Sequence, residues 1–396
     1  MLNTAILAIV TLTGAILIWP RVANSVIWRA TITPLASIIG SGFLILGPIL
    51  DVSYGGFAPL VMAGLCVVAY LFGSAIRFNI AIIETDPSSS RVINGLEATA
   101  SLVLAFAFII SVAYYLNLFG AFGVSLTELD DDFHANLLTT AVFLLILFTG
   151  LTRGYSALER LEQASVGLKL AIIAGLLLGL AVHFGDVANQ GALQFDAPEV
   201  TGWASLTLMA GLIVTVQGFE TSRYLGSTYD ARMRIKSMKL AQWISTGIYC
   251  VYILLLTYAF ESEPQFLNET AIINLMRIVA PILPLLLVAA ALSAQFSAAI
   301  ADTSGSGGLI AEVTKGVVPE RAAYALLVGV GILLTWTANL FEIISYASRA
   351  FALYYAIQGG IAALRAWRCN NSAHVALFGS VSLLGLAMAL FGTPVE

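Results

Sequence analysis

The hydrophobic pattern along the chain consists of long apolar runs separated by short polar loops. About 20 apolar residues are needed for a helix to cross the hydrocarbon core of a bilayer. Twelve runs have roughly this length, at about residues 2–19, 33–50, 56–82, 97–120, 135–151, 164–184, 203–222, 240–260, 281–303, 322–339, 341–364 and 374–392. The pattern therefore predicts an all-α integral membrane protein with about twelve transmembrane helices.

Two of these runs contain residues that interrupt a helix. The 33–50 run contains Gly40-Ser41-Gly42, and glycine weakens a helix by about 1 kcal/mol relative to alanine. Small residues at this place could instead serve close helix packing. The 203–222 run contains Gln217-Gly218-Phe219-Glu220, which sets a glycine beside a carboxylate at membrane depth. An ionisable residue inside a span indicates a functional site.

The two interrupted runs each begin a set of five runs, 33–184 and 203–364, and five is an odd number. The second set therefore crosses the membrane in the opposite sense to the first. Paired interrupted helices at corresponding positions of inverted repeats are typical of a transporter's substrate site near the bilayer midplane. This pairing favours the transporter interpretation over helix packing alone.

Composition and charge agree with a membrane protein. Hydrophobic residues make up 59% of the 396 positions and charged residues only 10%, against about 25% in soluble proteins. A net charge of −5 gives no basic stripe for a nucleic acid. Lys and Arg, Arg77 and Arg365 among them, mark alternate loops, whereas the other loops are acidic or neutral apart from Arg277 in a predicted amphipathic segment (266–279). The positive-inside rule therefore predicts both termini outside. The short loops suggest a bacterial inner membrane.

The residues that catalysis or metal binding would need are few. Three cysteines and three histidines are scattered far apart along the chain, with no metal-ligand spacing and no Ser/His/Asp arrangement in the runs. We therefore expect no metal, no cofactor and no enzymatic activity.

The chain resembles the amino acid–polyamine–organocation (APC) superfamily. The matching pieces are Ile39-Gly40-Ser41-Gly42-Phe43, Gly218-Phe219-Glu220, the polar stretch 229–232 and Lys169 in the 164–184 run. The resemblance implies the LeuT-like fold, a 5+5 inverted repeat with discontinuous first and sixth helices. It divides the chain into an extra N-terminal helix (1–30), two repeats (31–185 and 200–365) and a C-terminal helix (370–396).

The resemblance also implies which residues bind substrate at the first break. In the family, backbone amides of the first broken helix bind the substrate carboxylate. That role falls here on Ser41 and Gly42, with Gly40 as the hinge and Ile39 beside it.

The resemblance implies further substrate contacts on the sixth helix and on the third helix. Carbonyls at the sixth-helix break bind the substrate amine in the family, which implicates Gln217 and Gly218, with Phe219 as a gate or pocket wall. Polar and aromatic residues of the third helix often line the site in this fold, and Ser111 and Tyr115 occupy such positions here.

The identity of the coupling ion depends on the role of Lys169. A lysine near a membrane interface can snorkel, with its amine in the headgroup region. In proton-coupled relatives, however, a lysine at this place replaces a sodium ion, and a buried lysine can exchange a proton. Ser297 could donate a hydroxyl ligand to sodium or bond back to its own helix. Asp302 could pair with Lys169 or Arg223, or lie at a helix end. We favour proton over sodium.

Arg349 lies roughly in the middle of the 341–364 run. An arginine without a partner at that depth is costly, and Glu220 and Asp302 are the carboxylates that could neutralise it. Such a pair could be structural or could act on a substrate or a proton.

Together these features predict a proton-coupled secondary transporter of amino acids or related small amines. One alternative is transport of an inorganic cation or another non-amino-acid solute, with Glu220 as a cation ligand. An alternative of another class is a membrane sensor or accessory subunit without transport. The expected partners are a small-molecule substrate, a proton and the lipid bilayer, with no nucleic acid.

Overall fold

Helices occupy all twelve apolar runs in the computed structural model of the protein, which describes residues 1–40, 42–85, 90–152, 159–225, 228–261 and 270–395. In chain order the helices are α1 (Leu2–Ile18), α2 (Pro20–Ala23), α3 (Val26–Ile38), α4 (Gly42–Tyr54), η1 (Gly55–Phe57), α5 (Ala58–Thr85), α6 (Arg91–Val124), α7 (Asp132–Thr152), α8 (Glu159–Asn189), α9 (Gly202–Gly211), η2 (Ile213–Val216), α10 (Thr221–Tyr224), α11 (Ala231–Thr257), α12 (Ala271–Val279), α13 (Leu283–Val313), α14 (Glu320–Thr337), α15 (Leu340–Arg368) and α16 (Ser372–Phe391). The described residues contain no strand.

Each of the two runs with a predicted interruption is divided into separate helices. The 33–50 run is divided into α3 and α4, and the 203–222 run into α9, η2 and α10. Seven helical segments of the described chain are long and apolar enough to cross a membrane. The count of about twelve spans and the inverted repeat stay predictions.

Local sequence signals explain where several helices begin. Asp230 accepts a hydrogen bond from the backbone of Met233 at the start of α11, at 2.7 Å. Asn339 and Glu342 form a capping box at the start of α15. Each side chain satisfies a backbone N–H that the first turn of a helix leaves without a partner.

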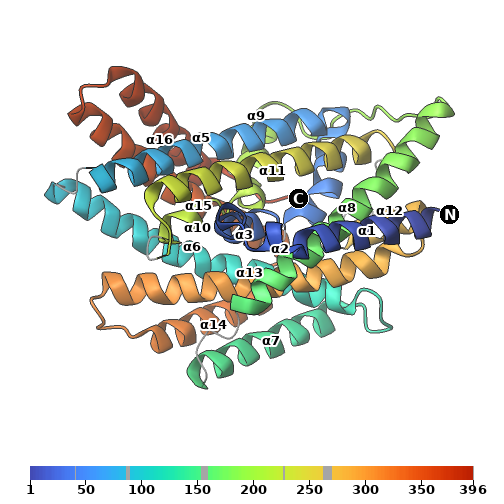
Figure 1. Cartoon of the computed structure of the whole chain (residues 1–396), viewed down its shortest axis with the longest axis horizontal. Helices are drawn as coiled ribbons and strands as arrows, with labels where there is room; N and C mark the ends of the chain where they lie inside the picture. The colour runs from blue at the N-terminus through green and yellow to red at the C-terminus, as the bar shows by residue number, and fades with distance from the viewer. Residues whose placement is uncertain (41, 86–89, 153–158, 226–227, 262–269, 396) are drawn as a thin grey trace.

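The long helices run side by side, roughly along the horizontal of Figure 1. The extra N-terminal helix α1 packs along α8, where Ile6 is fully buried. Gly175 of α8 permits this approach, because a Cβ there would lie 2.6 Å from Val10 of α1. The added helix therefore covers the helix that carries Lys169.

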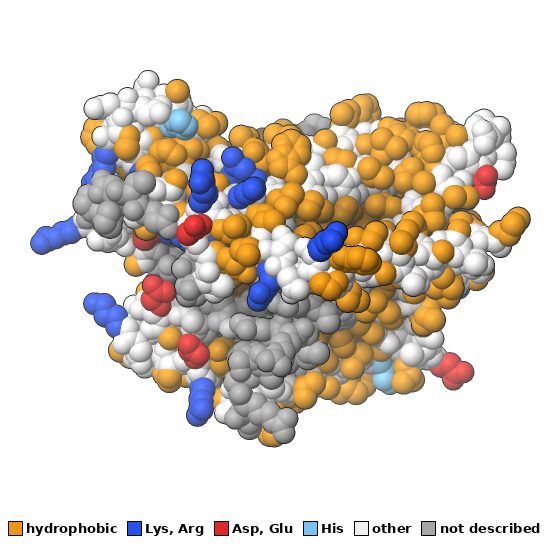
Figure 2. Space-filling view, viewed as in Figure 1, with side chains coloured by type: hydrophobic (Ala, Val, Ile, Leu, Met, Phe, Trp, Pro, Cys, Tyr) orange, Lys and Arg blue, Asp and Glu red, His pale blue; other side chains and the backbone are white. Residues whose placement is uncertain are grey.

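The two ends of the bundle differ in charge. We call the end where α5 and α15 end and α6 begins the basic end; it lies at the left of Figure 1. Figure 2 shows most of the visible Lys and Arg side chains in the left half of this face. At the opposite end lies α12, the described part of the predicted amphipathic segment 266–279, with Arg277 in its last turn.

Candidate functional site

The break between α3 and α4 frees backbone carbonyls inside the bundle. The α3 helix ends at Ile38, and Gly40 lies in a bend before α4 begins at Gly42. Ser41, a predicted substrate ligand, lies outside the described residues. The carbonyl of Ala36 accepts a hydrogen bond from Lys169, and that of Ile38 accepts one from Tyr249. Side chains from α8 and α11 thus satisfy carbonyls that a continuous helix would have bonded itself.

The second break lies between η2 and α10. Gln217 is extended, and Gly218 has a φ of +119°, a conformation that side-chain-bearing residues rarely adopt. Glu220 then occupies the position directly before the short helix α10, and its side chain makes no capping hydrogen bond to that helix. A glycine is therefore needed at position 218 for the chain to turn.

The two breaks interlock. A Cβ on Gly42 would lie 2.6 Å from the Cα of Thr215, and one on Gly218 would lie 2.6 Å from the backbone nitrogen of Ile38. The hydroxyl of Tyr249 lies 2.8 Å from both the Ile38 and the Thr215 carbonyl oxygens. Backbone therefore meets backbone at the centre of the bundle, and one tyrosine joins the two broken helices.

Glu220 is the carboxylate at this meeting point, and it is fully buried. One of its oxygens, Oε2, accepts hydrogen bonds from the Gly218 backbone at 3.0 Å and from the Tyr355 hydroxyl at 2.9 Å. Within the described part of the chain, its other oxygen, Oε1, has no hydrogen-bond partner. Buried polar atoms in native proteins rarely lack a partner, so this oxygen is a candidate contact for a ligand.

Gln217 repeats this pattern beside Glu220. It is buried, and its amide nitrogen donates to the hydroxyl of Tyr115 at 3.0 Å. Its amide oxygen, like Oε1 of Glu220, has no partner among the described residues. The structure thus places two buried hydrogen-bond acceptors next to the second break.

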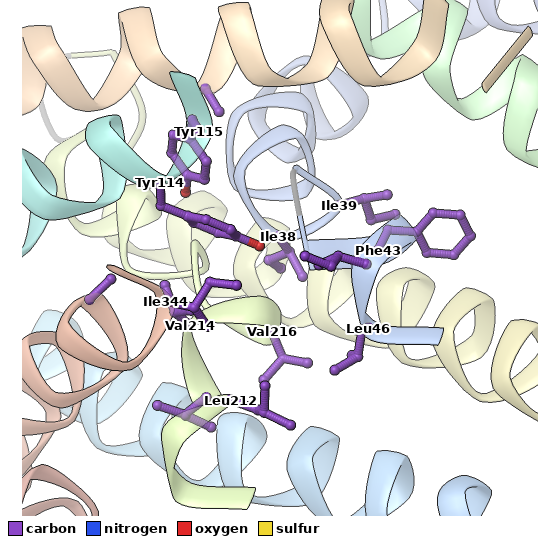
Figure 3. Packing of buried hydrophobic residues seen from close by; sticks show 14 of the residues in the cluster. Ile38, Ile39, Phe43, Leu46, Tyr114, Tyr115, Leu212, Val214, Val216 and Ile344 are labelled. Atoms are coloured by element: carbon purple, nitrogen blue, oxygen red, sulfur yellow. The ribbon is translucent and has the colours of Figure 1, made fainter. Parts of the chain in front are cut away.

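Aromatic rings pack around these two acceptors. Phe219 is fully buried and stacks on Tyr355 at 5.2 Å between ring centroids. Phe72 stacks on the same tyrosine at 4.7 Å. From α6, Tyr114 points toward Ile38 at the first break, as Figure 3 shows, and the hydroxyl of Tyr115 bonds to Gln217 at the second. Phe219 therefore forms part of a wall of stacked rings.

Lys169 does not snorkel to an interface. Only 1% of its surface is exposed, and its Nζ donates to the Ala36 carbonyl oxygen at 2.7 Å. A small cavity of about 20 Å³ lies beside it, lined by Gly40 of the first break and by residues of α8 and α13. The ammonium is thus held against the end of α3.

The helices α6 and α13 bring two more predicted residues together. The hydroxyl of Ser111 donates to the carboxylate of Asp302, and both residues are buried. Ser297, a predicted ion ligand, donates to the carbonyl of Ala294 on its own helix at 3.0 Å. Asp302 is therefore a buried residue inside α13, which excludes the alternative that it lies at a helix end.

Arg223 pairs with a carboxylate that the sequence did not single out. It donates to Glu97, which lies near the start of α6, and also to Gln358 of α15. The other oxygen of Glu97 accepts from Arg365 at 3.1 Å, and Arg365 also donates to the side chain of Asn79. This network joins α5, α6, α10 and α15 at the basic end. Arg365, expected in a loop, is 6% exposed.

Arg349 lies away from the predicted site. Its side chain is exposed, and its Nε donates at 2.8 Å to the Ala389 carbonyl in the last turn of α16. A cation at this place satisfies a free carbonyl and the negative end of the helix dipole. The expectation that Arg349 pairs with Glu220 or Asp302 is therefore wrong.

Two of the scattered cysteines are neighbours in space. The thiols of Cys66 on α5 and Cys250 on α11 lie close enough to influence each other, and both cysteines are free. Their separation of many residues along the chain hides this contact, because α5 and α11 pack side by side.

Comparisons with known proteins agree with this architecture. A family model described as "APC superfamily transporter" matches residues 20–392. An uncharacterized protein of Aquifex aeolicus (strain VF5) is 41% identical over 388 residues, which cover 95% of this chain and 93% of that protein. A solved nucleobase-cation-symport-1 family transporter, in a closed conformation with bromovinylhydantoin bound, is similar with a TM-score of 0.51.

That structure shares 14% sequence identity and covers 92% of this chain and 90% of its own, so the likeness concerns the fold. It is a LeuT-like fold, as the sequence predicts. The protein is thus a multi-pass membrane transporter and not an enzyme. The chain belongs to the APC superfamily of transporters.

Proposed function

We propose that the protein is a secondary active transporter of amino acids or related small amines and that it couples their movement to protons. The observation that carries this proposal is the pair of buried acceptor oxygens, on Gln217 and Glu220, where the two broken helices meet. The proposal includes two inverted repeats, residues 31–185 and 200–365, that alternate around these breaks in a bacterial inner membrane, with both termini outside.

The acceptors favour a substrate that carries hydrogen-bond donors. An ammonium group has three donors and no acceptor, so it can bond to an amide oxygen and a carboxylate oxygen at once. The hydrogen bond from the Tyr355 hydroxyl holds the Glu220 carboxylate in place while Oε1 stays available. In an amino acid, the carboxylate would bind backbone amides at the start of α4, near Gly42.

Lys169 supports coupling to protons. Its Nζ bonds to the last turn of α3, directly before the first break. The cavity beside it, about 20 Å³, has room for a water-sized group only, and the ammonium already supplies a positive charge there. When the lysine is protonated it donates strongly to the Ala36 carbonyl, and loss of the proton weakens that bond. Proton release would thereby alter the break itself.

A ligand screen tests the substrate class. Purified protein would be heated in detergent with single amino acids, polyamines, simple alkylamines and, as a contrast, neutral sugars. A ligand that binds the folded state raises its apparent stability. We expect stabilisation by at least one amine in the wild type and none in Gln217→Leu. Stabilisation by no amine would contradict the proposal.

A matched pair of variants tests the coupling. Lys169→Met removes the buried ammonium but keeps the apolar stem, and Lys239→Met makes the same change at an exposed position of α11. In proteoliposomes, the first should lose uptake driven by a pH gradient while still binding the amine, and the second should keep both. Gradient-driven uptake by Lys169→Met would contradict proton coupling through this residue.

The second candidate function is transport of an inorganic cation. The buried carboxylate of Glu220 favours this function because hard cations prefer oxygen ligands. The same screen with alkali and alkaline-earth chlorides separates the two. Stabilisation by a metal ion and by no amine would establish this second candidate.

A further inference from the structure

A cavity of about 580 Å³ opens at the basic end of the bundle, and charged side chains line it. Four are cationic, namely Arg223, Lys315, Arg365 and Arg368, and two are acidic, namely Glu97 and Glu312. The cavity has the volume of a small-molecule site and not of a single ion. We call it the basic cavity.

The charges of the basic cavity do not balance. Glu97 alone accepts from both Arg223 and Arg365. Lys315 and Arg368 lie exposed at the ends of α13 and α15. Among the described residues that line the cavity, cations therefore outnumber carboxylates. Guanidinium groups match the oxygens of a phosphate or carboxylate. The surplus charge favours an anionic occupant.

An apolar groove of about 520 Å³ lies next to the basic cavity, between α15, α16 and α6. Leu353, Ile357, Gly360, Leu364 and Trp367 line it at intervals of three or four residues, so they form one stripe along α15. Fourteen helical steps from the first to the last give a length of about 21 Å. One leaflet of a bilayer has a hydrocarbon depth of about 15 Å.

The groove and the basic cavity share two helices. On α15, Trp367 lines the groove and Arg368 lines the cavity. On α6, Leu96 lines the groove and Glu97 the cavity. An apolar stripe long enough to hold an acyl chain across one leaflet therefore reaches a cationic cavity at the end of the same helix.

We propose that these two features together bind one anionic phospholipid, with its phosphate in the basic cavity near Lys315 and Arg368 and an acyl chain in the groove along α15. Basic pockets between transmembrane helices bind the headgroups of anionic lipids, and each nearby Lys or Arg contributes to their attraction. The bound lipid would contact α6, α13, α15 and α16, and would hold their ends together.

The test compares phosphatidylglycerol with phosphatidylcholine of the same chains, by native mass spectrometry of the purified full-length protein in neutral detergent. The double variant Lys315→Gln/Arg368→Gln removes two charges from the cavity. The double variant Arg232→Gln/Lys236→Gln removes two exposed charges that do not line it. Gly360→Leu fills the groove, which Gly360 faces with only Ser382 near its Cβ position.

We expect one phosphatidylglycerol to bind in preference to phosphatidylcholine. The cavity variant should weaken that binding by about fivefold for each charge removed, or roughly 25-fold in all, while the matched control keeps it. Gly360→Leu should weaken it as well, with a melting profile close to that of the wild type.

Three results would overturn the proposal. Equal loss of phosphatidylglycerol binding in both double variants would show that the lipid is attracted to surface charge in general. Binding of glycerol 3-phosphate or inorganic phosphate as tight as that of the lipid, unchanged by Gly360→Leu, would show a site for a free phosphate compound. Equal binding of phosphatidylcholine and phosphatidylglycerol would show that the cavity does not select charge.

Discussion

Replacing Gly218 by alanine should loosen the meeting point of the two broken helices. The residue has a φ of +119°, and a Cβ there would lie 2.6 Å from the carbonyl carbon of Ser37 and from the nitrogen of Ile38. Ordinary contact begins at 3.4 Å, so backbone on one side must move by about 0.8 Å. Because these neighbours are main-chain atoms, rotation of a side chain cannot relieve the contact.

Two physical effects set the size of the destabilisation. A non-glycine residue in a sparsely populated backbone conformation costs about 1–3 kcal/mol. Overpacking of a tight site costs about 1–3 kcal/mol more. The control is Gly247→Ala, because Gly247 lies inside α11 with no atom within 4 Å of its Cβ position. In an open helical position, alanine should stabilise by about 0.5–1 kcal/mol.

The assay is thermal unfolding of the purified protein in one detergent, followed by intrinsic fluorescence. Gly218→Ala should unfold at a clearly lower temperature than the wild type, and Gly247→Ala at the same or a higher temperature. Identical curves for Gly218→Ala and Gly247→Ala would refute the argument that the breaks interlock through their backbones.

Three further changes test neighbouring parts of the structure. Tyr249→Phe removes the hydroxyl that lies against both break carbonyls, and should cost about 1–3 kcal/mol in thermal unfolding; an unchanged profile would contradict the bridging role. Glu97→Gln leaves two largely buried arginines without their carboxylate and should cost about 3 kcal/mol, which a wild-type melting temperature would disprove. Arg349→Gln removes one exposed hydrogen bond and should lower the free energy of unfolding by at most about 1 kcal/mol, without altering stabilisation by ligand. Loss of the stabilisation by ligand would indicate that Arg349 takes part in substrate binding.

The helices and the two breaks could be predicted from the sequence because both are local features. An apolar run of membrane length specifies a helix wherever it lies, and Gly40 and Gly218 specify where the helix stops. Helices lie in every predicted run, and the two runs with predicted interruptions are divided: the 33–50 run after Ile38, and the 203–222 run at residues 217–220. The earlier end of α9 at Gly211 was not predicted.

Contacts between helices could not be predicted in the same way. Lys169 and Arg349 carry the same sequence signal, a single cation in an apolar run, yet one is buried at the first break and the other is exposed beside α16. Hydropathy gives the depth of a residue and not its direction around the helix axis. Only the packing of neighbouring helices fixes that direction.

Basic residues near the ends of the apolar runs show a second limit. Arg77 and Arg365 were expected to mark loops, but α5 and α15 extend past them and both side chains are buried. Arg77 donates to Gln242 of α11, and Arg365 donates to Glu97 of α6. These partners lie 165 and 268 residues away along the chain, so no local sequence pattern predicts them.

The most direct test of proton-coupled transport measures proton flux itself. Proteoliposomes that hold a pH-sensitive dye would receive the amine that best stabilises the purified protein, without sodium. We predict that the lumen acidifies as the amine enters through the wild type and through Lys239→Met, and that Lys169→Met gives no acidification. Entry of the amine that requires sodium and leaves the lumen pH unchanged would contradict the central claim.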